Sequence, residues 1–244
     1  MSVPLLSVES VGVRYWRGRR MLHALTDVSL DLEAGEFGGV WGDRSSGKTT
    51  LAKVVAGVVP ADGGVVALDG EPLGGACRRE HQGVLHPQIG LATRRGPEIE
   101  ELPVETWIAS TIINRCSWRE ASRRAHLALE RVGVADIANE RWESLSDGER
   151  MLVAIAQAIV RGPRLLVVDD PVAGLSTRQR GEIMELLHSI AALGVAVLVT
   201  AAELSELQGA DRIWSLADGR LDGPPARALA PVLPLRGAGG AHAG

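Results

Sequence analysis

The segment GDRSSGKTT at residues 42–50 constrains this 244-residue chain more than any other part of its sequence. It satisfies the pattern G-x-x-x-x-G-K-[ST], whose glycines let successive backbone N–H groups turn toward one anion. The run before it is typical of a strand, and KTTLAKVVAGVV after it has apolar residues at helical spacing until Pro60. Strand, glycine loop and helix in this order predict a phosphate-binding site at a helix N-terminus.

The loop residues have distinct expected tasks. Lys48 would reach the β- and γ-phosphates of a nucleotide, and the Thr49 hydroxyl would join the shell of a Mg²⁺ ion. Only Lys48 and Lys53 among the 26 basic residues are lysines, and a lysine suits a point-charge role that a planar guanidinium fills poorly. The alternative is a glycine-rich turn that only caps a helix. The residues expected around the phosphates are Gly42, Ser45, Ser46, Gly47, Lys48, Thr49 and Thr50.

A second apolar run, LLVVDD at 165–170, delivers two carboxylates at the end of an expected strand. Asp169 is placed to hold Mg²⁺ through water, and Asp170 is placed to orient an attacking water. Taken alone, a strand that ends in Asp-Asp-Pro is more often an ordinary turn. The phosphate loop upstream reverses that preference, so we expect both carboxylates in one site.

The remaining periodicity predicts an α/β fold. A helix through RQRGEIMELLHSIAAL, a turn at Gly194 and the strand VAVLVT continue a β-α-β alternation, which is typical of a mainly parallel sheet. Residues 5–40 read as short strands and turns. Helical periodicity dominates from Val104 to Val132 and predicts an inserted helical lobe at about residues 98–145. The Pro-, Gly- and Ala-rich segment 223–244 predicts a flexible tail.

Composition excludes several classes of protein. With 45% hydrophobic and 23% charged residues and a net charge of −4, the chain is typical of a soluble globular protein, and no nucleic-acid partner is expected. Cys77 and Cys116 lack the spacing of a disulfide framework or a zinc site, which favours a reducing cytoplasm. The N-terminus does not read as a secretory signal. The longest uncharged run, Leu186 to Ala202, is interrupted by polar residues and too short to span a bilayer, so membrane association would require a partner.

The motif LSDGER at 145–150 decides between families of phosphate-loop proteins. It opens a long helix before the Asp-Asp strand and resembles the LSGGQ signature of ABC ATPases. The resemblance covers roughly Val8 to Gly223 and includes the order of the motifs. It implies a P-loop NTPase core with a mainly parallel sheet, an N-terminal antiparallel β subdomain and an inserted α-helical lobe, in one ATP-binding domain over residues 1–222.

The same resemblance implies a function. The chain would be the nucleotide-binding subunit of an ABC transporter, with ATP and Mg²⁺ bound between two such subunits and dimer closure coupled to a polytopic membrane subunit. It would then lie in the cytoplasm, peripheral at the inner face of the cell membrane. Ser146 and Gly148 would contact the γ-phosphate held by the opposite subunit, and Tyr15, or Trp16 beside it, would stack on adenine. Physical alternatives are a simple Ser N-cap and an aromatic packed at a strand edge.

Several positions depart from the family pattern. Asp170 stands where the family has its catalytic glutamate, and one methylene fewer retracts the carboxylate by about 1 Å. Ala201 replaces the histidine that follows the strand VLVT, and alanine can neither donate to a phosphate nor hold a water. Ser176 replaces the aspartate of the D-loop. The nucleotide-binding groups are kept, so we expect binding with slow hydrolysis, in which Lys48 and a weakened Asp170 are the catalytic groups.

The glutamine loop of the family has two possible alignments. Counting back from LPVETWI puts Arg94 at the glutamine position, whereas RREHQGVLHPQ suggests Pro87 or Gln88 followed by a longer loop. Because an arginine there would face Mg²⁺ with like charge, we favour Gln88.

Two other functions compete with a transport ATPase. One is a soluble ATP-gated regulatory or assembly subunit, or the non-catalytic half of a heterodimer. The other is a structural pseudo-ATPase that no longer binds nucleotide.

Overall fold

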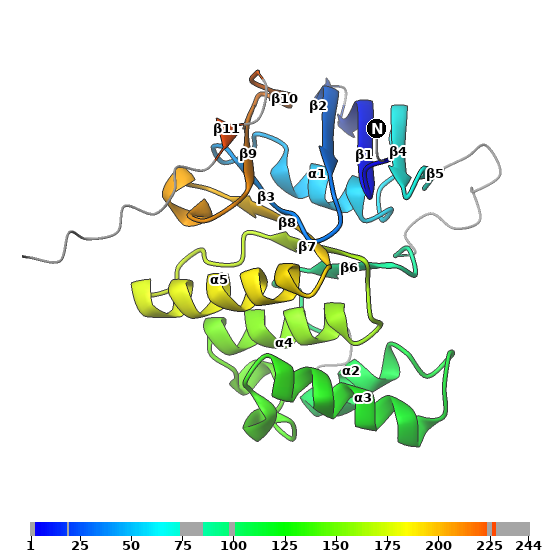
Figure 1. The fold of residues 1–244 in the computed structure, drawn as a ribbon, viewed down its shortest axis with the longest axis vertical. Coiled ribbons are helices and arrows are strands. Elements are labelled where there is room, and N and C mark those ends of the chain that lie inside the picture. The colour runs from blue at the N-terminus through cyan, green and yellow to red at the C-terminus, as the bar shows by residue number, and fades with distance from the viewer. Residues whose placement is uncertain (1–2, 19, 74–84, 98–100, 224–225, 228–244) are drawn as a thin grey trace, which may run out of the picture.

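Two β-sheets organise the molecule (Figure 1). The computed structural model describes residues 3–18, 20–73, 85–97, 101–223 and 226–227. The larger sheet has the strand order β10-β9-β3-β8-β7-β6, with β11 paired to β9. Neighbours from β9 to β6 run parallel, whereas β10 and β11 are antiparallel to β9. Its strands are β3 (Phe37–Trp41), β6 (Ile89–Ala92), β7 (Leu165–Asp169), β8 (Ala196–Ala201), β9 (Arg212–Ala217), β10 (Arg220–Leu221) and β11 (Ala226–Arg227).

The smaller sheet is antiparallel and comes from the N-terminal part of the chain. Its order is β2-β1-β4-β5; β1 pairs along its length with β2, and from Leu6 to Gly12 with β4. Outward and inward positions alternate in the second half of β2, so that Val28, Leu30 and Leu32 are buried. The strands are β1 (Leu6–Arg17), β2 (Arg20–Leu32), β4 (Gly63–Leu68) and β5 (Glu71–Pro72).

The helices lie on both sides of the parallel sheet. In Figure 1, α1 lies on the side of the antiparallel sheet, α4 and α5 lie on the opposite side, and α2 and α3 lie beyond α4. No helix of the described ranges is long and apolar enough to cross a membrane. The helices are α1 (Lys48–Val55), α2 (Val104–Ser110), α3 (Trp118–Arg131), α4 (Asp147–Ile159) and α5 (Thr177–Ala192), with 3₁₀ turns at Ala135–Ile137, Trp142–Ser144 and Leu204–Leu207 (η4).

This arrangement confirms the expected fold: an α/β core with a mainly parallel sheet, an antiparallel N-terminal sheet and inserted helices, among them α2 and α3. One boundary differs from the expectation. Ala226 and Arg227, placed in the flexible tail by composition, form β11 against Ile213 and Arg212. Residues 228–244 of that tail lie outside the described residues.

Strand β7 separates two hydrophobic clusters. Successive side chains of a strand point to opposite faces. Leu166 and Val168 join the cluster of α2 to α5, whereas Leu165 and Val167 join the cluster formed by α1 and the antiparallel sheet. A strand buried on both faces explains why this segment is continuously apolar up to its terminal aspartate.

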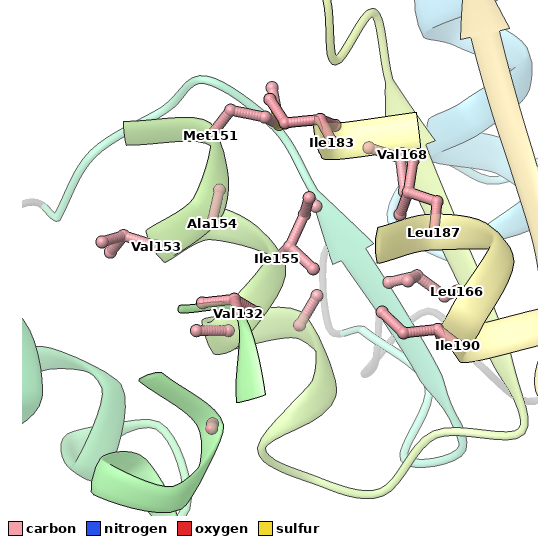
Figure 2. Close-up of a cluster of buried hydrophobic side chains, with 14 of the residues drawn as sticks. Val132, Met151, Val153, Ala154, Ile155, Leu166, Val168, Ile183, Leu187 and Ile190 are labelled. Atoms are coloured by element: carbon pink, nitrogen blue, oxygen red, sulfur yellow. The ribbon is translucent and has the colours of Figure 1, made fainter. Parts of the chain in front are cut away.

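The buried side chains of α4 and α5 pack against one face of β7, and this packing fixes the position of Asp169 at the end of the strand. Figure 2 shows Met151 of α4 pointing toward Ile183 of α5, and Leu187 beside Val168 of β7. Ile155 lies in the same cluster and is completely buried.

A charged contact joins the two sheets. Arg212 of β9 donates to both carboxylate oxygens of Asp31 in β2, at 2.8 and 3.0 Å. Its guanidinium also lies over the ring of Trp214, 4.8 Å from the ring centroid. The hydrogen bond from Arg212 lowers the pKa of Asp31, despite the opposing effect of partial burial.

Truncation of Ile155 tests the role of this cluster. Because Ile155→Ala removes buried methyl groups and leaves a cavity, we expect a loss of about 2–5 kcal/mol in the free energy of unfolding. Chemical denaturation measures it. The control is Leu127→Ala on α3, where the side chain is 46% exposed and the expected change is below about 1 kcal/mol. Equal losses for the two variants would contradict the assignment of this core.

Candidate nucleotide-binding site

The phosphate loop joins the end of β3 to the first turn of α1. The Lys48 ammonium folds back over the loop, donating to the carbonyls of Gly42 and of Asp43, the latter at 2.7 Å. Ser45 and Gly47 have positive φ values of 67° and 111°. Positive φ values next to a helix start are typical of loops that bind anions, and this role of the loop stays a prediction.

Two glycines of the loop lie so close to neighbouring backbone atoms that no side chain fits. A Cβ on Gly42 would lie 2.1 Å from the carbonyl oxygen of Leu216, and one on Gly47 would lie 2.5 Å from that of Ala24. Both obstacles are backbone atoms, which cannot rotate away. The loop is therefore wedged between β9 and β2, and only glycine fits at these positions.

Hydrogen bonds to neighbouring strands fix the loop further. The Gly42 N–H donates to the Ala201 carbonyl at the end of β8 (3.3 Å), and the Ser46 carbonyl accepts from the Gly219 N–H (2.9 Å). Ser46 is nearly fully buried. Thr49 and Thr50 follow in the first turn of α1, and Thr49 is exposed.

Asp169, Asp170 and Thr200 meet at the same edge of the sheet as the loop. Because β3, β8 and β7 are parallel, their carboxyl ends lie together. The Thr200 hydroxyl donates to Asp169 Oδ1 (2.7 Å) and accepts from the Asp170 N–H (3.0 Å). This buried threonine, which sequence reasoning missed, fixes the Asp169 carboxylate and the backbone of Asp170. The Asp169 carboxylate and the exposed Thr49 hydroxyl are oxygen donors of the kind that Mg²⁺ prefers.

Asp170 occupies an unusual position. Its φ is 53°, a conformation that aspartate tolerates better than most residues. Its Oδ1 is buried without a hydrogen-bond partner in the described residues. Burial raises the pKa of Asp170, and the negative charge of Glu206 raises it further, while Arg94 opposes the shift. An unsatisfied, partly desolvated carboxylate beside a phosphate loop fits a role in contact with a ligand or water.

Glu206 is the second group that sequence reasoning missed. It lies in η4, with a side chain only 5% exposed. One oxygen accepts from Arg180 of α5 at 3.2 Å, and the other accepts from the N–H groups of Ala202 and Glu203, each at 3.1 Å. The segment AAELSELQG has no periodicity that indicates a buried glutamate, so no local signal could have identified it.

The structure places Arg94, and not Gln88, at the site edge. Strand β6 runs parallel to β7 with Ala92 opposite Val168, so Arg94 leaves the sheet on the same edge as Asp169. Arg94 donates to the carbonyl of Ala173. The Gln88 carbonyl instead accepts from the Arg164 N–H (2.8 Å), at the amino end of β7. The expectation for Gln88 is therefore wrong, because strand direction puts it on the opposite edge.

Ser146 and Gly148 lie at the start of α4, on the far side of the parallel sheet from α1 (Figure 1). Ser146 forms a capping box with Glu149: its hydroxyl accepts from the Glu149 N–H (3.4 Å) and donates to the Glu149 carboxylate (2.6 Å), which also accepts from the Ser146 N–H (2.8 Å). These bonds lower the pKa of Glu149. A Cβ on Gly148 would lie 2.9 Å from Gln179 of α5. No described contact joins either residue to the phosphate loop of the same chain.

Tyr15 lies on the β1–β2 hairpin, opposite Leu22. Tyr15 and Trp16 are 41% and 73% exposed, so neither is packed into the core. Ala24, further along β2, touches Gly47 of the loop. The hairpin thus leads from the phosphate loop to two exposed aromatic side chains.

Known proteins resemble this chain over most of its length. Residues 25–173 match the protein family described as "ABC transporter". The chain is 35% identical over 219 residues to the aliphatic sulfonates import ATP-binding protein SsuB of Cupriavidus necator, covering 88% of this chain and 67% of SsuB. It is 31% identical over 241 residues to the phosphonates import ATP-binding protein PhnC of Thiobacillus denitrificans, covering 93% and 90%.

Other relatives are longer than this chain. It spans 33% of the macrolide export ATP-binding/permease protein MacB 1/2 of Paracoccus denitrificans, at 30% identity, and 66% of the methionine import ATP-binding protein MetN of Nocardia farcinica, at 31%. Among solved structures, the ATP-binding cassette MJ0796, a dimer bound to ADP and Pi, superimposes with a TM-score of 0.82 at 24% identity, covering 92% of this chain and 99% of that one. That likeness concerns the fold alone.

The wedged position of Gly42 gives a direct test of the loop geometry. Because the added methyl of Gly42→Ala would collide with the Leu216 carbonyl, we expect a loss of about 1–3 kcal/mol in the free energy of unfolding. The control is Gly63→Ala in β4, where an added Cβ meets nothing within 4 Å. Urea denaturation compares the two, and a Gly42→Ala protein as stable as the control would show that the loop is not confined in this way.

The buried carboxylate of Glu206 gives a second test. Glu206→Gln keeps the shape but turns an NH₂ group toward donors, so we expect a loss of about 1–3 kcal/mol in thermal or chemical unfolding. Glu182→Gln is the matched control, because Glu182 forms an exposed i,i+4 pair with Arg178. Its expected loss is about 0.5 kcal/mol or less. Indistinguishable effects would mean that Glu206 is not held as described.

Proposed function

The chain belongs to the ABC transporter family of ATP-binding proteins, and on this premise we propose that it binds Mg·ATP at the edge formed by β3, β7 and β8 and drives a transporter by closing with a second ATP-binding subunit. The observation that carries the proposal is the phosphate loop: a Lys48 ammonium held over turned backbone amides, beside the Asp169 carboxylate at the end of β7. The cargo-carrying part of such a system is a polytopic membrane subunit.

Each part of the nucleotide has a candidate partner in this chain. The amides of Ser45, Gly47 and Thr50 and the Lys48 ammonium would hold the phosphates, and Tyr15 would stack on the base. Gly42 and Ser46 would shape the loop around the phosphates, because their own N–H groups donate to the carbonyls of Ala201 and Asp43. Thr49 and Asp169 would hold Mg²⁺, which neutralises charge on the β- and γ-phosphates when bound. Lys48 needs only to exchange two backbone carbonyls for phosphate oxygens.

A second subunit is needed to complete the site. The start of α4 presents the positive end of a helix dipole and an exposed Ser146, yet α4 and α1 lie on opposite sides of the parallel sheet. In a head-to-tail dimer, Ser146 and the Gly148 backbone would face the γ-phosphate held by the partner. MJ0796, whose fold this chain shares, has been solved as a dimer bound to ADP and Pi. The partner is a second copy of this chain or a related subunit.

The helices α2 and α3 offer the surface for the membrane subunit. Apolar side chains are exposed on α3 and in the segment that precedes it: Ile113 and Trp118 are each 50% exposed, and Leu127 is 46% exposed. Exposed apolar side chains of this kind are available for contact with a partner protein. The chain would then sit at the inner face of the cell membrane, held by its partner and without a span of its own among the described helices.

Hydrolysis in this site is slow. Asp170 provides a shorter carboxylate than the glutamate of the family, and Ala201 gives its carbonyl to Gly42 but has no polar side chain. Ser176 serves as the N-cap of α5 through a capping box with Gln179. These three positions also favour a second candidate function, the non-catalytic half of a heterodimer, whose partner would hydrolyse ATP in the site that Ser146 completes.

Steady-state turnover tests the proposed chemistry. We expect the purified chain to hydrolyse ATP more slowly than about 1 per second. Asp170→Glu should raise the rate about tenfold or more, because it moves the carboxylate outward by about 1 Å toward a bound water. A wild-type rate above this limit would refute slow hydrolysis.

Nucleotide binding has its own control, since the chain contains a second lysine. Lys48→Ala should weaken ATP binding about tenfold or more, while Lys53→Ala, at the other end of α1, should leave it unchanged. Calorimetric titration measures both. Loss of binding in both variants, or in neither, would contradict the role of Lys48.

Copurification with a polytopic membrane protein separates a transport subunit from a soluble regulator.

A further inference from the structure

Arg94 brings a permanent positive charge to the edge where the nucleotide site would hold a metal. Strand β6 ends at Ala92, which pairs with Val168, so Arg94 follows β6 at the same edge of the sheet as the two aspartates that follow Val168. Its guanidinium donates to the Ala173 carbonyl, in the turn between β7 and α5. Its charge also acts on Asp170, whose pKa it lowers against the effect of burial. The residue is therefore held at the site and exposed.

Most of the hydrogen-bond donors of Arg94 are available for a ligand. The Glu206 carboxylate already accepts hydrogen bonds from Arg180 and from two backbone N–H groups, so it is not available as a partner for Arg94. Within the described ranges, the one hydrogen bond of Arg94 uses a single nitrogen, and a guanidinium carries five N–H donors. Planar pairs of such donors match phosphate oxygens. A divalent cation brought to the same place would instead experience like-charge repulsion.

We propose that Arg94 donates to the terminal phosphate of bound ATP and supplies part of the positive charge that Mg²⁺ supplies in other ATP-binding sites. This chain then binds ATP with little dependence on a divalent cation. The inference rests on the proposed function, because it requires ATP in the phosphate loop. It also links the nucleotide to the Val172–Leu175 turn through the Ala173 carbonyl.

ATP titrations of the full chain with Mg²⁺ and with EDTA test this inference without any need for hydrolysis. We expect the Kd of the wild-type protein to change less than about tenfold between the two conditions, since a charge-assisted hydrogen bond is worth roughly one to two powers of ten in affinity. Arg94→Gln should weaken binding in EDTA about tenfold or more and restore a strong gain from Mg²⁺. ADP, which lacks the terminal phosphate, should bind both proteins alike in EDTA.

A matched control is the adjacent residue. Arg95→Gln removes the same charge from an exposed side chain, and we expect wild-type behaviour from it. Arg94→Lys keeps the charge but not the paired donors and should give an intermediate Kd in EDTA. Melting temperatures of all variants establish that they are folded.

The outcomes separate the two proposals. If the wild-type chain binds Mg·ATP but loses measurable affinity in EDTA, or if Arg94→Gln and Arg95→Gln behave alike, the inference on Arg94 is overturned while nucleotide binding stands. If ATP binds under neither condition, the proposed function fails and this inference fails with it.

Discussion

The site depends on one constraint, the common direction of β3, β8, β7 and β6. Parallel strands end on one edge of a sheet, and each of these four delivers a functional group there: the phosphate loop, Thr200 with Ala201, the Asp169–Asp170 pair, and Arg94. These four groups come from four separate parts of the sequence. The buried clusters on both faces of β7 hold that edge in place, so core packing determines the geometry of the site.

The sequence alone predicted the features that depend on neighbouring residues. The strand, glycine loop and helix around Lys48 follow from a short pattern, and the apolar run before Asp169 identifies a strand buried on both faces. The capping signals at Ser146 are equally local. The α/β fold followed from the order of such motifs, and the antiparallel N-terminal sheet was implied by the resemblance to ABC ATPases.

The features that sequence reasoning missed depend on contacts between distant residues. Glu206 is buried by Arg180 and by amides that only the folded chain brings to it, and Thr200 acquires its role by lying between two aspartates. Gln88 and Arg94 could not be separated by residue chemistry, since the repulsion expected between arginine and Mg²⁺ favoured the wrong residue. Strand direction decided between them. If the end of a strand is predicted a few residues away from its true position, the wrong side chain is assigned to the site.

The capping box at the start of α4 has a consequence for assembly. Ser146 and Glu149 satisfy each other through three hydrogen bonds, so the isolated subunit has a well-stabilised helix end. In the proposed dimer, the Ser146 hydroxyl has no proton to offer a phosphate until it leaves the Glu149 carboxylate, and Asp147 adds a second negative charge beside it. The hydrogen bonds that stabilise the isolated subunit therefore oppose formation of the proposed dimer with nucleotide between the two subunits. Weakening this cap would shift the balance from monomer toward dimer.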